Sequence, residues 1–284
     1  MHIVEDFVNI TFGEWLFFWY ETYKRPRLKP YSLRNIEQMI RLHTPKWLKE
    51  KRMSDITVFD IDYALSVIPV SRTYIYTRQV WHSAFVKACR YGIVKQNPVD
   101  LCERISYVKN AGKPLTLKEQ ADFIERLQES RYKWLMLFYL YTGTRRTEAI
   151  TLEWPDIDYE EGLILIKGTK TVGSYRHILL TEDVRNILEG QRYQNEVLSI
   201  CTPRVFPFSA QQASRHFKKL CPNHHLHDLR HTYITRCAES GVNVNVCQQL
   251  VGHASTDMTM NVYTHVMDDF KRKEAAKFTL FPRF

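Results

Sequence analysis

Several side chains in the second half of the chain have types and spacings that suit chemistry on a phosphate ester. Arg145 follows a Gly-containing turn and stands where a helix is predicted to begin, so its planar guanidinium can reach a phosphate with help from the helix dipole. His227 and Arg230 are three residues apart, which places a proton-transfer group and a second guanidinium on one helical face. Tyr263 follows His253 by ten residues. Each of these features alone is also typical of a solvated turn or helix surface.

The segments that must position these side chains are mostly helical. Apolar spacing predicts helices in the first part of the chain, with Ser32 and Ser71 as caps, at 15–23, 33–42 and 74–91. In the rest of the chain, Thr116 is predicted to cap the first of several further helices. Their ranges are 118–128, 132–141, 146–152, 182–192, 210–220, 227–240, 244–251 and 256–263. Two short apolar runs at 163–166 and 177–180 predict a hairpin or a three-stranded antiparallel sheet.

The length and the charge favour two domains. A chain of 284 residues exceeds the usual size of one core, and Gly112 and Pro114 interrupt the helical pattern. We therefore expect a helical domain at 1–109, a linker at 110–114 and a mixed α/β domain at 115–284. The net charge is +9, and residues 1–112 hold 17 basic and 11 acidic side chains. The excess of positive charge suits a polyanionic partner.

Composition excludes several classes of protein. No apolar run reaches the roughly 18 residues of a membrane span, and the acidic N-terminus does not look like a secretory signal. The six cysteines form no CxxC pair and are typical of reduced thiols. The phosphate-binding pattern GxxxxGK[ST] is missing, which argues against ATP use. We expect a globular cytoplasmic protein without a membrane partner.

A cluster of metal-ligand residue types near the second histidine motif leaves one alternative open. Its members are Cys221, His224, His225, His227 and His231. Structural zinc sites usually pair two separated clusters, and the sequence has no second one. The sequence therefore favours a metal-free mechanism over a metal-dependent nuclease, which stays as an alternative.

Taken together and in order, the motifs resemble the tyrosine recombinase (phage integrase) family. The stretches TGTRRTEA, HDLRHTYITRCAESGV and QQLVGHASTDMTMNVYTHV look like that family's phrases over residues 145–263. The resemblance implies a helical core-binding domain followed by a catalytic domain that is mainly α with a small antiparallel sheet. If Met1 is the natural start, the chain resembles the two-domain members, which lack an arm-binding domain.

The resemblance also implies a role for each residue of the motif. Tyr263 is the nucleophile that forms a 3′-phosphotyrosyl bond and frees a 5′-hydroxyl, and His227 accepts its proton. Arg145, Arg230 and His253 stabilise the phosphate charge. Glu148 matches an acidic position that supports the site.

The family's lysine is expected in the hairpin turn, where it protonates the leaving 5′-oxygen. Lys170 in TKT fits that turn, and Lys167 lies three residues earlier. We favour Lys170. No metal or organic cofactor is expected.

The expected partners follow from the family. They are double-stranded DNA recombination sites, a homotetramer on that DNA, and accessory DNA-bending proteins in some systems. The tail at 267–284 begins with a charged helical pattern and ends with the apolar residues Phe278, Leu280, Phe281 and Phe284. It is expected to dock on a neighbouring protomer, or to fold back on its own domain. A catalytically silent DNA-binding relative is the remaining alternative, although every reactive position is filled.

Overall fold

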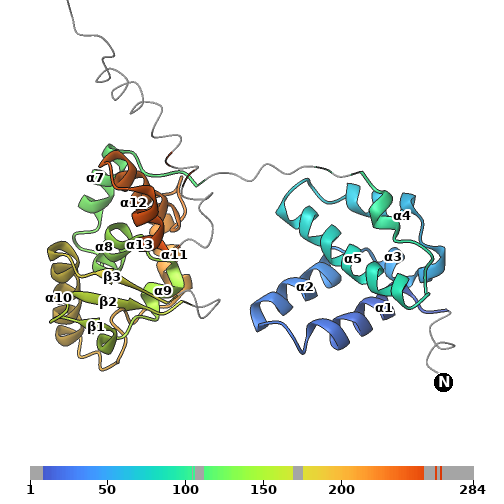
Figure 1. Cartoon of the computed structure of the whole chain (residues 1–284), viewed down its shortest axis with the longest axis horizontal. Coiled ribbons are helices and arrows are strands. Elements are labelled where there is room, and N and C mark those ends of the chain that lie inside the picture. Colours follow the sequence, from blue (N-terminus) through green and yellow to red (C-terminus); the bar gives the residue numbers. More distant parts are fainter. Residues whose placement is uncertain are drawn as a thin grey trace, which may run out of the picture. The chain divides into compact units, whose positions relative to one another are not determined.

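The computed structural model describes residues 9–103, 105, 112–168, 175–252, 260 and 263. The chain divides into two compact units, Met1–Asn110 and Ala111–Phe284, each with its own core (Figure 1). Each unit is described by itself.

Over residues 9–103 the first unit is built from helices joined by turns. They are α1 (Phe12–Trp19), the π-helical turn η2 (Tyr20–Lys24), α2 (Pro30–Leu42), α3 (Lys46–Glu50), the 3-10 turn η3 (Met53–Asp55), α4 (Val58–Ser66), α5 (Arg72–Arg90) and α6 (Pro98–Leu101). Thr11 caps α1, and Ser71 caps α5 as the sequence predicts. Ser32 is not a cap, because Pro30 begins α2 one turn earlier and Lys29 holds the cap position.

Large aromatic side chains form the core of the first unit. Trp15, Trp19 and Trp81 are buried there together with Phe12 and Phe85. The indole N–H of Trp15 donates to the Ala84 carbonyl at 3.0 Å, which satisfies a polar group that burial would otherwise leave unpaired.

The second unit places a small sheet among helices. Its elements are α7 (Leu117–Arg126), α8 (Lys133–Thr142), α9 (Arg146–Ile150), η4 (Trp154–Asp156), β1 (Ile157–Asp158), β2 (Leu163–Ile166), β3 (Arg176–Leu179), α10 (Glu182–Val197), α11 (Ala210–Leu220), α12 (Asp228–Glu239) and α13 (Val244–Val251). The strands are antiparallel in the order β1-β2-β3, and Ile164 pairs with both Ile157 and Ile178. The expectation of a mainly α fold with a small antiparallel sheet is confirmed.

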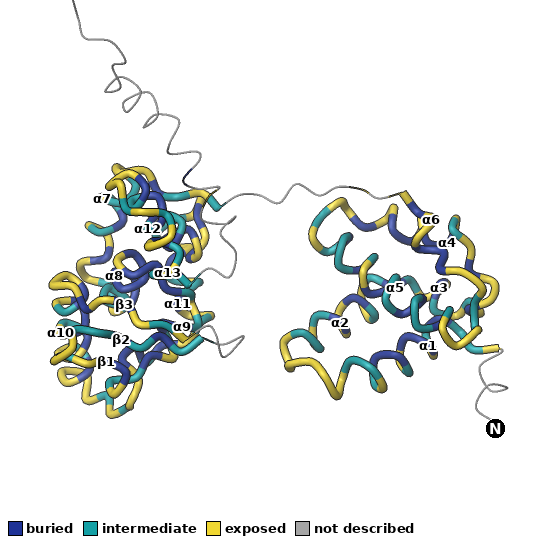
Figure 2. The backbone as a smooth tube through the Cα atoms, viewed as in Figure 1, coloured by how far each residue is buried: buried dark blue, intermediate teal, exposed yellow. Residues whose placement is uncertain are grey.

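Helix α8 is the centre of the second core. It is apolar on almost every side, and it contacts both α10 and α12 (Figure 2). A helix that is hydrophobic all round must be enclosed by other elements. Because both chemical motifs adjoin α8 or the helices against it, this core fixes their spacing.

Most predicted boundaries agree with the structure. The bounds of β2, α11 and α13 match the sequence pattern, whereas α10 runs on to Val197. The predicted helix at 256–263 and the tail at 267–284 lie outside the described residues, apart from Met260 and Tyr263. In the ranges that the structure describes, no helix combines the length and apolarity that a membrane crossing requires.

Candidate active site

The turn between α8 and α9 presents Arg145. Gly143 ends α8 in the left-handed region at φ 61°, and a Cβ atom there would lie 2.5 Å from the ring of Tyr233. Glycine is therefore required for both conformation and space. Arg145 then occupies the cap position of α9, where its backbone N–H donates to Glu148 Oε2 at 2.8 Å.

Glu148 and the end of α13 hold the guanidinium of Arg145. Nη1 donates to Glu148 Oε1 at 2.6 Å, and Nη2 donates to the Gly252 carbonyl at 2.5 Å. Glu148 Oε2 also accepts a bond of 2.9 Å from Arg176. Burial would raise the pKa of Glu148, but the bond and charge of Arg176, with the bonds from Arg145, lower it to about 2. The carboxylate is therefore charged and orients both arginines.

Arg230 is a buried cation whose donors are mostly unused. Only 1% of the residue is exposed, and Nη1 donates to the Gly143 carbonyl at 2.7 Å. Its Nε and Nη2 atoms are buried without a hydrogen-bond partner in the described part of the chain. Burial and the charge of Arg145 lower the pKa of Arg230 to about 9. Glu148 attracts the group from a distance, but no carboxylate among the described residues forms an ion pair with it, as a buried charge usually needs.

His227 caps α12 one turn before Arg230. Its carbonyl accepts the backbone N–H of Arg230 at 3.1 Å, and its ring meets that of His231 edge to face at 5.0 Å. Burial first, then the charges of His231 and Arg230, lower the pKa of His227 to about 4. The imidazole is therefore neutral at pH 7 and able to accept a proton.

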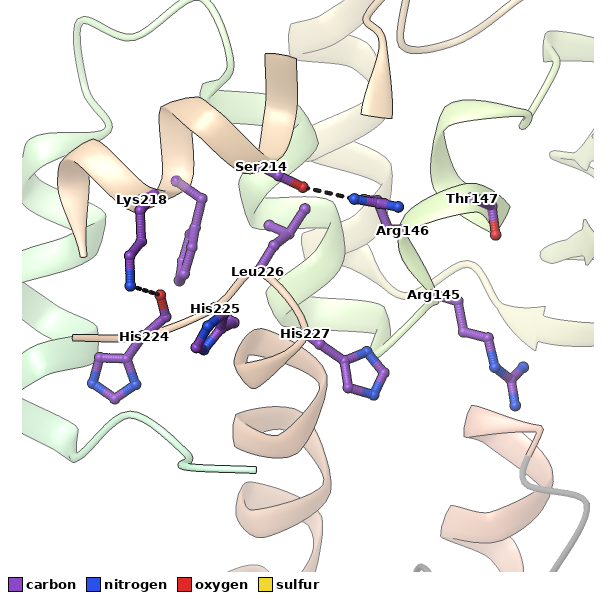
Figure 3. A pocket seen from close by; sticks show the side chains of 10 residues that line it. Arg145, Arg146, Thr147, Ser214, Lys218, His224, His225, Leu226 and His227 are labelled. Atoms are coloured by element: carbon purple, nitrogen blue, oxygen red, sulfur yellow. Dashed lines mark hydrogen bonds between the residues drawn. The ribbon is translucent and has the colours of Figure 1, made fainter. Parts of the chain in front are cut away.

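Arg145 and His227 line one cavity of about 650 Å³ (Figure 3). Both side chains point to the same side of it in the close-up view. Further along, Arg146 Nη1 donates to Ser214 Oγ at 3.0 Å, and Lys218 Nζ donates to the His224 carbonyl at 3.4 Å. The cavity is thus lined by cations from the α8–α9 turn and α11, and by the neutral His227 at the start of α12.

Tyr263 packs against α12 and α13. Its residue is 6% exposed and packs with Ile234, Cys247 and Val251, while the hydroxyl donates to the Val242 carbonyl at 3.0 Å. Burial and a hydrogen bond shared with Cys247 raise the pKa of Tyr263 well above its usual range. The structure brings Arg145, His227 and Arg230 together but does not bond the Tyr263 hydroxyl to any of them within the ranges it describes.

Two of the expected site residues cannot be placed. Lys170 and His253 lie outside the described residues. Lys167 is described, and its Nζ forms ion pairs with Asp156 at 2.6 Å and with Glu153 at 3.6 Å. These bonds tie Lys167 to the turn before β1.

The histidine and cysteine cluster of the sequence does not form a metal site in the described part of the chain, although three of its histidines line the cavity. His224 is buried and contacts Glu119 at 3.2 Å and the Lys113 carbonyl at 3.1 Å, whereas His225 is exposed. Within the part of the chain that is described, no three His, Cys, Asp or Glu side chains are grouped so that they could hold a metal. The sequence cluster therefore gives no support to the nuclease alternative.

Sequence reasoning missed Arg176 and the cations around the cavity. Alternation along β3 places Arg176 on the same face as the buried Ile178 and Leu180. An arginine on the core face of a strand needs a buried anionic or carbonyl partner, and this signal could have identified it. Nothing in the sequence brings Arg146 next to Ser214, which is 68 positions away.

The geometry suits stabilisation of an anion. Arg145, Arg176 and Arg230 gather around a single carboxylate, Glu148, which leaves an excess of positive charge. Arginine presents planar donors that match phosphate oxygens. A neutral histidine beside these donors can move a proton.

Comparison with known proteins agrees with this geometry. The model of the phage integrase family matches residues 114–269, and that of the phage integrase N-terminal SAM-like domain matches residues 11–64. The tyrosine recombinase XerA of Pyrococcus furiosus is 32% identical over 177 residues, covering 56% of this chain and 59% of the relative. The matches span only about half the length of other curated relatives.

Solved structures share the fold. The Tn1549 transposon integrase in complex with transposon right end DNA has a TM-score of 0.76 at 18% identity, covering 95% of this chain and 99% of that one. The lambda integrase tetramer bound to a Holliday junction has a TM-score of 0.75 at 21% identity, covering 89% and 80%. Because the family model alone covers more than half of the sequence, this chain belongs to the phage integrase family.

Proposed function

We propose that this chain is a site-specific DNA recombinase that cleaves and rejoins DNA through a 3′-phosphotyrosyl intermediate, without ATP or metal. The observation that carries the proposal is Arg230, a buried guanidinium with two unpartnered nitrogens beside Arg145. A phosphodiester supplies the anion that these donors lack. Preorganised donors of this kind stabilise developing charge without reorganisation at the moment of reaction.

The proposed cleavage step balances without an outside reagent. The Tyr263 oxygen attacks phosphorus, its proton passes to the neutral His227, and the bond from phosphorus to the 5′-oxygen breaks. Arg145 and Arg230 hold the non-bridging oxygens. The phosphotyrosine is itself a diester, so the reverse attack by a 5′-hydroxyl rejoins the strand.

Tyr263 must change partners before it can attack. In the conformation described, its hydroxyl donates to the Val242 carbonyl, and its raised pKa makes it a poor nucleophile. Cleavage therefore requires the phenol to break its hydrogen bond to the Val242 carbonyl and to move to the phosphate.

Lys170 and His253 enter the proposal through their motif positions. We assign Lys170 to protonation of the leaving 5′-oxygen and His253 to a further bond with the phosphate. The ion pairs of Lys167 with Asp156 and Glu153 support a structural task for that residue. A substrate with sulfur in place of the 5′-bridging oxygen needs no protonation, so it should restore cleavage by Lys170→Ala. Lys167→Ala should cleave the ordinary substrate. If Lys167→Ala instead fails on the ordinary substrate and is rescued by the sulfur substrate, Lys167 is the residue that protonates the leaving oxygen.

The remaining parts of the proposal concern partners. Residues 1–109 form a core-type DNA-binding domain, residues 110–114 a linker and residues 115–284 the catalytic domain with its tail. Recombination joins two sites, so we propose a homotetramer on double-stranded DNA, in keeping with the lambda integrase tetramer on its junction. Accessory DNA-bending proteins are candidates for further partners. Action on host DNA places the chain in the cytoplasm, at the nucleoid.

Covalent trapping tests the function. Nicked duplex fragments that tile the DNA flanking the gene are incubated with the full chain in chelator and resolved on denaturing gels. We expect one fragment to become attached to protein, and Tyr263→Phe to bind that fragment without attachment. The exposed Tyr193 provides the matched control, because Tyr193→Phe should attach normally.

The alternatives give different results. A metal-dependent nuclease cleaves without attachment and is silent in chelator, and a silent relative binds without cleavage. Attachment by Tyr263→Phe would move the nucleophile elsewhere and contradict the assignment.

A further inference from the structure

Arg176 joins three parts of the second unit that are far apart in the sequence. It begins β3, its Nη2 donates to Glu148 Oε2 of α9 at 2.9 Å, and its Nε donates to the Leu250 carbonyl of α13 at 2.8 Å. Only 10% of the side chain is exposed. Arg176 therefore lies between elements and faces the interior.

These bonds close a ring with those of Arg145. Arg145 donates to Glu148 at one end and to the Gly252 carbonyl, two residues beyond Leu250, at the other. Arg176 connects the same carboxylate to the same end of α13. Each of the two planar guanidinium groups thus connects Glu148 to the end of α13. Each restricts the other, because both are bonded to the Glu148 carboxylate.

Gly252 completes the fit. It has φ +65°, and a Cβ atom at this position would lie 2.9 Å from Arg176 Nη1 and 3.0 Å from its Cδ. The missing side chain lets the guanidinium pass close to the backbone at the end of α13. Arg176 Nη1 is buried and has no hydrogen-bond partner among the described residues, so its stem and its other two nitrogens fix its place.

We propose that Arg176 is a positioning residue for strand cleavage, which fixes the Arg145 guanidinium relative to the end of α13. This inference rests on the proposed recombinase function. Without Arg176, Glu148 and the end of α13 lose the guanidinium that joins them, and Arg145 can move between orientations. A misplacement of about 1 Å at a reacting centre can cost roughly 100-fold in rate.

The first test compares two substrates. In a methylphosphonate, a methyl group replaces one non-bridging oxygen at the scissile position, so the transition state carries less negative charge and depends less on Arg145. We expect Arg176→Gln to slow cleavage of the ordinary suicide substrate by about 10- to 100-fold, with single-site DNA affinity within about threefold. On the methylphosphonate the defect should shrink, in parallel with that of Arg145→Ala.

The control and the coupling follow the same design. Arg185 stacks on Tyr159 and takes no part in the ring, so Arg185→Gln should cleave both substrates normally. In the Glu148→Gln background, Arg176→Gln should add little further loss, because the two groups act through one contact. Equal defects on both substrates, or full additivity, would show that Arg176 only supports the fold and would overturn the proposal.

A spectroscopic measurement tests the positioning role of Arg176 without measuring cleavage. Nitrogen-15 spectra of the guanidinium groups should show slow rotation for Arg145 in the native chain, because both of its terminal nitrogens are bonded. We expect Arg176→Gln to lose these signals while its thermal unfolding still shows a folded second unit. Unchanged Arg145 signals would refute the positioning role. Failure of the native chain to cleave DNA would count against the proposed function alone.

Discussion

Replacing Arg230 by methionine should stabilise the DNA-free chain and abolish DNA cleavage. Methionine fills the buried site with an unbranched apolar side chain and removes a cation that forms no ion pair in the described part of the chain and leaves two of its nitrogens without a hydrogen bond there. Opposite effects on stability and activity are expected where a site is built for a charged ligand.

The size of the gain follows from the structure. The pKa of Arg230 is held at about 9 by burial and the charge of Arg145, roughly 3.5 below that of free arginine, which corresponds to about 5 kcal/mol. Loss of the bond to the Gly143 carbonyl leaves a buried acceptor unpaired, at a cost of about 1–3 kcal/mol. The net increase in the free energy of unfolding is therefore roughly 2–4 kcal/mol, similar to other replacements of buried ionic groups.

Calorimetry and urea unfolding of the full chain measure this difference. Arg236 on the same helix provides the matched control, since it donates to Gln120 at 3.0 Å, to the Leu115 carbonyl at 2.8 Å and to Glu239 at 2.5 Å. Arg236→Met should destabilise the chain by about 1–3 kcal/mol. Inorganic phosphate should stabilise the native chain more than Arg230→Met. If Arg230→Met lowers the free energy of unfolding as Arg236→Met does, the buried cation is already satisfied and the reasoning fails.

Three further predictions concern the groups around Arg145. Glu148→Gln should destabilise the chain at pH 7, and the difference in free energy of unfolding between this variant and the native chain should narrow as the pH falls from about 4.5 towards 2. The reason is that the folded chain holds the pKa of Glu148 near 2, so the stability from the charged carboxylate is lost through that range. Urea unfolding measures the difference, and a constant value would contradict this. His227 should titrate near pH 4 in proton NMR spectra, so that it is neutral at pH 7 and the chain gains stability from pH 4 to about 6.5; titration near 6.5 would remove the argument for a buried neutral base. Both Gly162 and Gly252 have positive φ, so replacement of either by alanine should lower the free energy of unfolding by about 1–2 kcal/mol through backbone strain. Gly252→Ala should cost more than Gly162→Ala, because only Gly252 lies against Arg176, and equal losses would exclude a clash.

Much of the local structure could be predicted from the sequence. The caps Ser71 and Thr116, the strand 163–166 and the helix 244–251 all agree with the pattern. These features depend on contacts within a few residues, such as a hydroxyl that accepts a nearby backbone N–H or a glycine in the left-handed region. The order of motifs was likewise sufficient to predict the family.

Distribution of the histidines shows where local patterns fail. The sequence places His224, His225 and His227 together, and all three line the cavity, yet His224 is buried against Glu119, His225 is exposed and His227 lies near Arg230. These residues precede α12 in an irregular segment, where no fixed period relates sequence spacing to side-chain direction.

The long-range contacts of the site were decided by the tertiary structure alone. Arg176 meets Glu148 from 28 positions away and Leu250 from 74, and Arg145 meets Gly252 from 107. Such contacts arise because the core around α8 brings α9, β3 and α12 together, and α13 packs against α12 and β3. A buried charge is stable only where the fold supplies its partners. The seating of Tyr263 on the Val242 carbonyl has the same origin. The sequence by itself determined which chemical groups this protein carries, and the packing of its second unit determined which of them are held, which are unpartnered and which are kept apart.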